Sequence, residues 1–392
     1  MGMLSGIKVV DLSRVMSGPY CTALLADMGA EVVKIETPQG GDDARHFGPY
    51  VNGHSIYFAQ LNRNKKSVAL NLKQPEACDA LRKLVANADV VVENFRPGVA
   101  QRLGVDYASM SAINPRLVYL SISGFGQEGA LRDQPAYDLV IQAMSGLMHI
   151  TGDPQGGPTS VGESVADMWT GLFGSWSVLA ALLARERGGP GRHIDLPMFD
   201  AMIALQVTAF SRLLADGKAP MRVGNRHPIT TPVDSFAARD GHVVIVVSHD
   251  GAFRKFAALM GQAQLGDDPR FRDTAARRAH EPELKEIISA WMRGHSVDEV
   301  LAACRAADIP AGPVWDIERA RRQLQEQDSP MLRTLEHPLG GPIQFVLQPA
   351  RFSDESSSPR RDPMLGEHTA EVLEGLGLTE AEIDRLTRKQ AT

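Results

Sequence analysis

The stretch from residue 4 to residue 36 reads LSGIKVVDLSRVMSGPYCTALLADMGAEVVKIE, and it decides the fold class. Residues 7–12 and 31–36 are short runs rich in Val and Ile, a pattern typical of buried strands. Between them lie a Gly- and Pro-containing loop at residues 13–19 and an apolar helical stretch that runs to Met28. This strand–helix–strand order predicts two parallel strands joined by a crossover helix.

The same alternation continues along the first half of the chain. Further strands are expected at residues 67–72, 89–93, 117–121 and 193–196, with helices at 75–88, 168–187 and 199–215. Strands that alternate with helices predict an α/β fold, here a Rossmann-like open parallel sheet with helices on both faces. This large domain is expected to span residues 1–216.

From residue 217 the pattern changes to Pro-rich turns, one strand and several helices. A strand at 242–247 and helices at 253–260, 281–293 and 297–306 predict a smaller α+β domain over residues 217–318. Residues 319–392 are expected to return to the large domain, with a strand at 343–347 and a helix at 369–376. Residues 353–363 are polar and contain Pro, so they are expected to form an exposed loop.

Composition excludes several classes of function. The chain has 392 residues and a net charge of -6, and its two signs of charge are interleaved, so no basic surface for nucleic acid or anionic membranes is expected. No apolar run approaches the roughly 20 residues that span a bilayer. The three cysteines are far apart, which indicates neither a disulfide framework nor a metal site and fits a reducing cytoplasm.

Ligands of such sheets bind beyond the carboxyl ends of the strands. The loop after the first strand, SRVMSGPY, has one glycine and no GxGxxG, which argues against NAD binding. Asn94, Phe95 and Arg96 directly follow the strand at 89–93. An aromatic ring and a guanidinium suit a ligand with a base and phosphates, and Arg102 offers a second cation. The alternative is a plain turn ending in Pro-Gly.

Three acidic or basic positions remain open on the residues alone. Asp167 precedes the most apolar helix, where it is either a helix cap or a desolvated nucleophile. Tyr137 and Asp138 form a second candidate acidic site. His149 is either a base or a core histidine.

Several long, ordered motifs run along nearly the whole chain. They are residues 4–36 above, LNRNKKSVALNLKQPE (61–76), DVVVENFRPGVAQRLG (89–104), SISGFGQEG (121–129), AYDLVIQAMSGLMHITG (136–152), VADMWTGLFGSWSVLAALLAR (165–185), GRHIDLPMFDAMIAL (191–205), IPAGPV (309–314) and LGEHTAEVL (365–373). Together they resemble the class III CoA-transferase family, which includes formyl-CoA transferase, carnitine CoA-transferase and α-methylacyl-CoA racemase. SGLMHITG and NRNKKS look particularly similar to the branch that handles dicarboxylates, such as succinyl-CoA:glutarate transferase.

The resemblance implies a CoA-transferase that works through an aspartyl anhydride and thioester, with Asp167 as the nucleophile. It implies acyl-CoA and small carboxylic acids as substrates, no tightly bound cofactor, and an interlaced homodimer. Asp138 matches an acidic position that lines the same pocket. The implied CoA contacts are Met16, Ser17, Leu72, Lys73, Asn94, Phe95, Arg96 and Arg102.

The chain also departs from the family pattern. Thr37 stands where many members have an arginine after the second strand. VVSHDGAFRKF (246–256) replaces the glycine run of the formyl-CoA enzymes, which argues against formyl or oxalate specificity. Tyr137 replaces the histidine that serves racemases as a base, which argues against racemisation.

The predicted function is therefore exchange of CoA between succinyl-CoA, or another dicarboxylyl-CoA, and a free acid. A dicarboxylate needs a cation for its distal carboxylate, and Arg45 is the first hypothesis and Arg14 the second. Tyr137 and His149 are further candidates for contact with substrate. The alternatives are an acyl-CoA racemase or isomerase on the same fold and a non-catalytic CoA- or nucleotide-binding protein.

Overall fold

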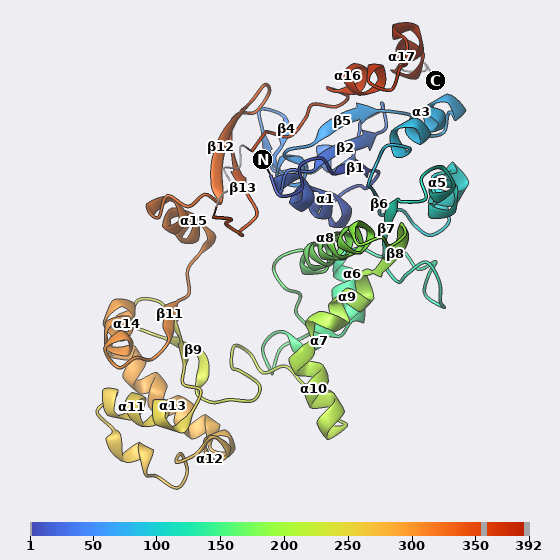
Figure 1. Cartoon of the computed structure of the whole chain (residues 1–392). Coiled ribbons are helices and arrows are strands. Elements are labelled where there is room, and N and C mark those ends of the chain that lie inside the picture. Colours follow the sequence, from blue (N-terminus) through green and yellow to red (C-terminus); the bar gives the residue numbers. More distant parts are fainter. Residues whose placement is uncertain (1, 354–358, 388–392) are drawn as a thin grey trace. The chain divides into compact units, whose positions relative to one another are not determined.

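The computed structural model of the chain describes residues 2–353 and 359–387 (Figure 1). The chain forms two compact units, Met1–Leu147 with Val161–Ser211 and Asp328–Thr392 in the larger, and Met148–Ser160 with Arg212–Gln327 in the smaller. The smaller unit therefore includes residues 148–160, which the sequence analysis placed in the large domain. Part of the loop expected at residues 353–363 lies outside the described residues.

The larger unit is built on a six-stranded parallel sheet with the strand order β5-β2-β1-β6-β7-β8. Numbered along the chain, this is the order 3-2-1-4-5-6 of doubly wound folds, so the winding reverses between β1 and β6. The predicted open parallel sheet is confirmed. The strands are β1 (Lys8–Asp11), β2 (Glu31–Glu36), β5 (Lys66–Ala69), β6 (Val90–Glu93), β7 (Val118–Ser123) and β8 (Arg192–Pro197).

Side chains of the central strands alternate between two buried faces. Val10 and Val91 belong to one core with the helices α3, α5, α16 and α17, while Val9 and Val92 belong to a second core with α1, α6, α8 and α9. The first group of helices is α3 (Pro75–Val85), α5 (Tyr107–Ile113), α16 (Thr369–Glu374) and α17 (Glu380–Thr387). The second is α1 (Ser17–Asp27), α6 (Asp138–Met144), α8 (Val165–Glu186) and α9 (Met198–Leu205).

Short elements complete the larger unit. The hairpin β12–β13 packs its Ile343 and Phe345 against Ala59 of α2. It brings a segment near the C-terminus to the segment that follows β2 (Figure 1). The elements are η1 (Asp43–His46), β3 (Tyr50–Val51), β4 (His54–Ser55), α2 (Ile56–Asn62), α4 (Val99–Leu103), β12 (Leu332–His337) and β13 (Gly341–Val346). Helix α7 (Leu147–Ile150) begins at the last residue of the segment Met1–Leu147, and its other residues belong to the smaller unit.

Two predicted helices differ from the structure in ways that matter. Helix α8 begins at Val165 instead of residue 168, so Asp167 lies inside its first turn. The helix expected at residues 199–215 is broken at Gln206 into α9 and α10 (Val207–Asp216). The buried Gln206 amide donates to the backbone oxygens of Met202 and Ser145, which draws this residue out of helical geometry.

The smaller unit is an antiparallel three-stranded sheet covered by helices, as the α+β prediction requires. Its core contains Phe236, Ile245, Phe253, Ile288 and Val300. The elements are β9 (Val233–Ala237), β10 (His242–Val246), α11 (Asp250–Leu259), η2 (Ala263–Gly266), α12 (Thr274–Ala279), α13 (Glu281–Arg293), α14 (Val297–Ala306), β11 (Ala311–Pro313) and α15 (Ile317–Glu326).

Within the described ranges, no single helix is long and apolar enough to cross a bilayer. Only the bent pair α9 and α10 meets the length and composition criteria when the two helices are taken together.

Candidate active site

A cavity of about 460 Å³ opens where the loops after β1 and β6 diverge. Doubly wound sheets bind their ligands at this place because the two loops leave the sheet in opposite directions. Nine of the residues proposed from the sequence lie on its wall. They are Arg14, Met16, Ser17, Asn94, Phe95, Arg96, Arg102, Tyr137 and Asp167.

Asp167 reaches the cavity from the first turn of α8. Desolvation, with a smaller contribution from the charge of Asp138, raises the pKa of Asp167 to about 7. The hydroxyl and the backbone N–H of Ser17, at the start of α1, oppose the rise. Asp167 is thus a partly desolvated carboxylate whose pKa is close to neutral pH.

Asp167 does not cap α8, because the side chain of Asp138 does so instead. Asp138 Oδ1 accepts from the backbone nitrogens of Ala166 at 2.7 Å and Asp167 at 3.3 Å, and Gln142 Nε2 donates to its other oxygen at 2.7 Å. Ser164, the residue at the N-cap position, makes no capping bond with its side chain. The carboxylate of Asp167 therefore has no capping role, and Asp138, which was expected to line the pocket, caps the helix and does not line this cavity.

The approach of α1 to α8 depends on glycine. A Cβ at Gly171 would lie 2.6 Å from the backbone oxygen of Ser17, and one at Gly174 would lie 3.2 Å from Cys21 Sγ. Since both glycines are on α8, the two helices pack with their backbones close together. This contact brings Ser17 to Asp167.

The residues after β6 divide into one that shapes the site and others that face the cavity. Asn94 Oδ1 accepts from the backbone N–H of Arg14 at 2.8 Å, and Asn94 Nδ2 donates to the backbone oxygen of Arg14 at 2.8 Å. Its amide therefore fixes the loop after β1. Arg96 and Arg102 are exposed on the cavity wall, and neither forms a salt bridge with any residue that the structure describes. Two free guanidinium groups at a cavity mouth suit an anionic ligand.

A second cavity, of about 300 Å³, adjoins the first and shares Arg14, Asp43 and Phe95 with it. Leu72 and Lys73, proposed from the family resemblance, line this second cavity, as does Thr37. The shared residues make the two cavities neighbours along the carboxyl edge of β1, β2, β5 and β6. A long ligand fits this arrangement better than a compact one.

The two arginines proposed for a distal carboxylate have different surroundings. Arg45 donates to both oxygens of Glu36 at 2.7 Å and lies 3.8 Å from the centre of the Phe58 ring, and it lines neither cavity. Arg14 lines both cavities and forms an exposed ion pair with Asp43. The position of Arg14 favours it over Arg45 for contact with a ligand.

Tyr137 and His149 are placed in different units. Tyr137 is 71% exposed and lines the first cavity. His149 belongs to the smaller unit, where its backbone oxygen accepts from Arg222 Nη1 at 2.9 Å. A role for either side chain in contact with substrate stays a prediction.

A cluster of buried histidines and a carboxylate was not foreseen. Nε2 of His54 lies 3.0 Å and Nε2 of His337 3.9 Å from Asp362 Oδ2, and the two rings are stacked. His337 Nδ1 accepts from the backbone nitrogens of Leu339 and Gly340, so its proton is on Nε2, the atom that a metal would need. Parallel rings also cannot both direct an in-plane lone pair at one ion. The geometry of these donors therefore does not favour a metal.

Sequence reasoning also missed a buried group of charges beneath the first cavity. Asp11, Lys34, Asp42 and Lys65 are at most 3% exposed. Charged residues are usually solvated, and nothing in the local pattern separates Asp42 and Lys65 from surface charges. Asp11 and Lys34 lie within apolar strands, as in VVKIE, and for these two residues that was the available signal.

Comparisons with known proteins point to one family. The model of CoA-transferase family III matches residues 4–369. Succinate–glutarate CoA-transferase of Agrobacterium fabrum is 39% identical over 378 residues, covering 94% of this chain and 94% of the relative. Acetyl-CoA:oxalate CoA-transferase of Acetobacter aceti is 44% identical over 320 residues, covering 81% and 82%.

Among solved structures, a CAIB/BAIF family protein from Brucella suis superposes with a TM-score of 0.84 at 37% sequence identity. The match covers 96% of this chain and 99% of that one. The resemblance drawn from the motifs is thereby confirmed over nearly the whole chain.

Proposed function

The chain belongs to CoA-transferase family III, and from this membership we propose that it moves CoA between a dicarboxylyl-CoA and a free carboxylic acid, with Asp167 as the nucleophile. The observation that carries the proposal is the Asp167 carboxylate on the wall of a cavity that also exposes the unpaired Arg96 and Arg102. Succinate–glutarate CoA-transferase among the relatives supports succinyl-CoA as donor.

The proposed reaction proceeds through covalent steps that conserve protons. An oxygen of Asp167 attacks the thioester carbonyl, a C–O bond forms, the C–S bond breaks, and CoA leaves as thiolate. The thiolate attacks the aspartyl carbonyl of the resulting anhydride, which releases the donor acid and leaves an aspartyl thioester. The acceptor carboxylate then displaces the thiolate to form a second anhydride, and the thiolate attacks the acceptor's acyl carbon and frees Asp167. Each step is easier than direct exchange between two acids.

The chain's own residues supply binding and orientation. Arg96, Arg102 and Lys73 are the proposed partners of the CoA phosphates, and Phe95, shared by both cavities, is the proposed apolar contact. Binding energy from this inert tail holds the reacting atoms together. The Ser17 N–H and hydroxyl are the proposed donors that orient the Asp167 carboxylate, because both favour its ionised form. CoA is a substrate throughout, and this chemistry needs no bound cofactor.

For the distal carboxylate of the acceptor we propose Arg14, with Arg45 as the alternative. Arg14 lines the cavity of Asp167, whereas the charge of Arg45 is already matched by Glu36. Arg14→Ala is expected to raise the KM of the acceptor dicarboxylate and to leave that of a monocarboxylate unchanged. The same effect from Arg45→Ala alone would reverse the assignment.

An interlaced homodimer is also proposed. Leu172, Trp176 and Leu183 on α8 are 45%, 62% and 54% exposed, which is unusual for large apolar side chains on a long helix and leaves a face for a second copy. Light scattering after size exclusion tests it, and a monomer at micromolar concentration would contradict it.

The decisive experiment is mass spectrometry of the protein after incubation with succinyl-CoA and hydroxylamine. An activated aspartyl group is converted to a hydroxamate, which is expected at Asp167 in the wild type and absent in Asp167→Ala. The donor panel includes acetyl-CoA and the acceptor panel oxalate, because one relative is an acetyl-CoA:oxalate CoA-transferase.

Other outcomes separate the rival functions. Binding of every acyl-CoA without modification of Asp167 would indicate a non-catalytic binding protein. Solvent deuterium at the α-carbon of a branched acyl-CoA would indicate a racemase, a reading that the tyrosine at position 137 disfavours.

A further inference from the structure

The loop that brings Ser17 to Asp167 has an unfavourable backbone conformation. Val15, in the middle of this loop, has a φ of +66°. L-residues rarely adopt this left-handed region, and for a β-branched side chain it is strained. Such a conformation persists only where neighbouring groups hold it, and it is often found at functional sites.

A buried ion pair holds Val15 in this conformation. Asp42 Oδ1 accepts from the backbone nitrogen of Val15 at 3.0 Å, and its Oδ2 lies 2.8 Å from Lys34 Nζ. Lys34 Nζ also donates to the backbone oxygen of Ser13 at 2.8 Å. The side chains of Lys34 and Asp42 are 0% and 1% exposed. The pair therefore holds the loop at two backbone atoms, the oxygen of Ser13 and the nitrogen of Val15.

Other contacts anchor the two ends of the same loop. Asp11 accepts from the Ser13 backbone nitrogen at 2.9 Å, and Lys65 Nζ bridges Asp11 and the backbone oxygen of Pro19 in the first turn of α1. The charge of Asp42 raises the pKa of Lys34, and that of Lys34 lowers the pKa of Asp42, although burial opposes both shifts. Both members of the pair are therefore charged at neutral pH.

We propose that Lys34 and Asp42 are positioning residues for CoA transfer: their ion pair holds Val15 in its strained conformation and thereby aims the Ser17 donors at the Asp167 carboxylate. This proposal rests on the proposed function of Asp167. Neither side chain lines the cavity that contains Asp167, and Asp42 lines only the neighbouring one, so both act on Asp167 through the loop.

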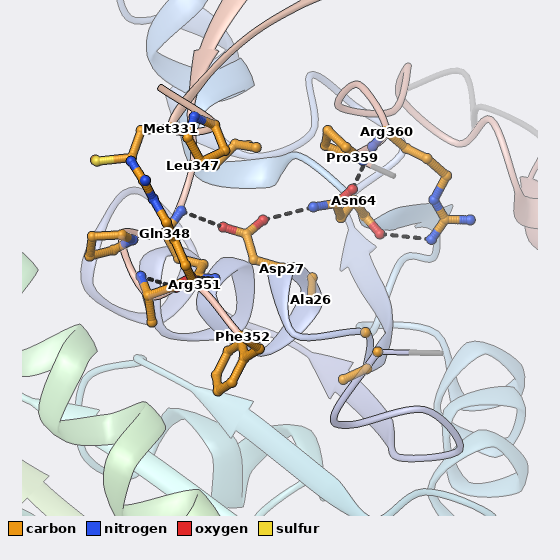
Figure 2. Close-up of a pocket in the computed structure, with 16 residues that line it drawn as sticks. Ala26, Asp27, Asn64, Met331, Leu347, Gln348, Arg351, Phe352, Pro359 and Arg360 are labelled. Carbon is orange, nitrogen blue, oxygen red and sulfur yellow. Dashed lines mark hydrogen bonds between the residues drawn. The ribbon is translucent and has the colours of Figure 1, made fainter. Parts of the chain in front are cut away.

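The test compares Asp42→Asn with a matched control, Asp27→Asn. Asparagine at position 42 keeps an oxygen for the Val15 N–H but loses the ion pair. Asp27, at the other end of α1, is an equally buried carboxylate that pairs with Arg63 and accepts from Asn64 and Gln348 (Figure 2). It contacts no part of the loop after β1.

Asp42→Asn is expected to lower kcat by ~100-fold, the usual effect of misplacing a catalytic group by about 1 Å, while KM for acyl-CoA changes by less than ~3-fold. Asp27→Asn is expected to lower the Tm similarly and to keep kcat within ~2-fold of the wild type. Equal kcat losses in both variants, or none in Asp42→Asn, would overturn the proposal.

Recovery of kcat by a second substitution distinguishes a positioning role from a purely structural one. In the Asp42→Asn background, Val15→Gly is expected to restore kcat at least ~10-fold, because glycine adopts a positive φ without strain and no longer needs the ion pair. A failure to restore kcat would overturn the proposal. If Asp42→Asn does not fold, Lys34→Met/Asp42→Asn replaces it, since this double variant leaves no unpaired buried charge.

Hydroxamate formation separates this proposal from the one it rests on. If the wild type forms no hydroxamate at Asp167 with any donor, the proposed function fails, and this inference fails with it. If the wild type forms it and Asp42→Asn forms it at the same rate, only the positioning role is refuted.

Discussion

Replacing Asp167 with asparagine is expected to abolish transfer and to make the folded protein more stable at neutral pH. Asparagine has nearly the shape of aspartate and retains an oxygen that accepts from Ser17, but it cannot ionise. The comparison therefore isolates the free energy of placing a charge at this position.

The size of the effect follows from the pKa of Asp167, which the fold raises from 3.8 to about 7. The folded protein binds this proton more tightly than the unfolded chain does, so ionisation favours unfolding, and stability is lost as the pH rises from about 4 to about 7. About three pKa units at about 1.4 kcal/mol each give a limit of about 4 kcal/mol above pH 7. Solvent reaches part of the carboxylate, so we expect about 2–4 kcal/mol.

Urea unfolding followed by circular dichroism, at pH 5 and pH 8 and at one protein concentration, measures the difference. Asp167→Asn should have a higher free energy of unfolding than the wild type, and this difference should be larger at pH 8 than at pH 5 by about 1–3 kcal/mol. Asp133→Asn serves as control, because Asp133 lines the same cavity with a side chain that is 84% exposed. Its effect should stay within about 0.5 kcal/mol at both pH values.

A difference between Asp167→Asn and the wild type that does not change with pH would refute the reasoning. It would mean that Asp167 ionises in the folded protein as it does in the unfolded chain. The cavity would then not desolvate the carboxylate.

Three further predictions concern the same site. The value of kcat/KM should rise with pH through about 7 as Asp167 ionises in the free enzyme, and a rate profile that is flat from pH 5 to pH 8 would contradict this. Gly171→Ala should lower both kcat and the free energy of unfolding, the latter by about 1–3 kcal/mol, because the new Cβ would lie 2.6 Å from the Ser17 oxygen. Gly162→Ala is the control: its Cβ would meet no atom within 4 Å, so neither quantity should change in the same kinetic and melting assays. Arg102→Ala should raise the KM of acyl-CoA by ~10-fold or more at unchanged kcat in steady-state assays, and a loss of kcat instead would remove it from the role of a remote binding residue.

Much of the architecture was predictable because it depends on short-range pattern. The runs around Val9 and Val32 are β-branched and apolar, and a helical stretch lies between them, so a parallel pair was the expected result. The loops expected to bind ligand were identified for the same reason, since they follow recognisable strands. Asp167 was proposed as the nucleophile from a long family motif, because its position before a helix by itself favoured a cap.

Boundaries and partners were harder to predict. The start of α8 was placed three residues late because Val165 and Ala166 carry no capping signal of their own, and the cap comes from Asp138 in another helix. The break at Gln206 depends on a bond to Ser145, far away in the chain. Neither can be read from neighbouring residues.

The sequence by itself determined which segments form the six strands of the large sheet, that this sheet is parallel, and which residue types face its carboxyl edge, because these depend on patterns a few residues long. Only the tertiary structure decided that Ser17 lies beside Asp167. It also decided that Arg45 forms an ion pair with Glu36, and that Lys34 forms a buried ion pair with Asp42. These contacts join elements distant in sequence, and they exist because glycines on α8 and the reversal of winding beside β1 bring those elements together.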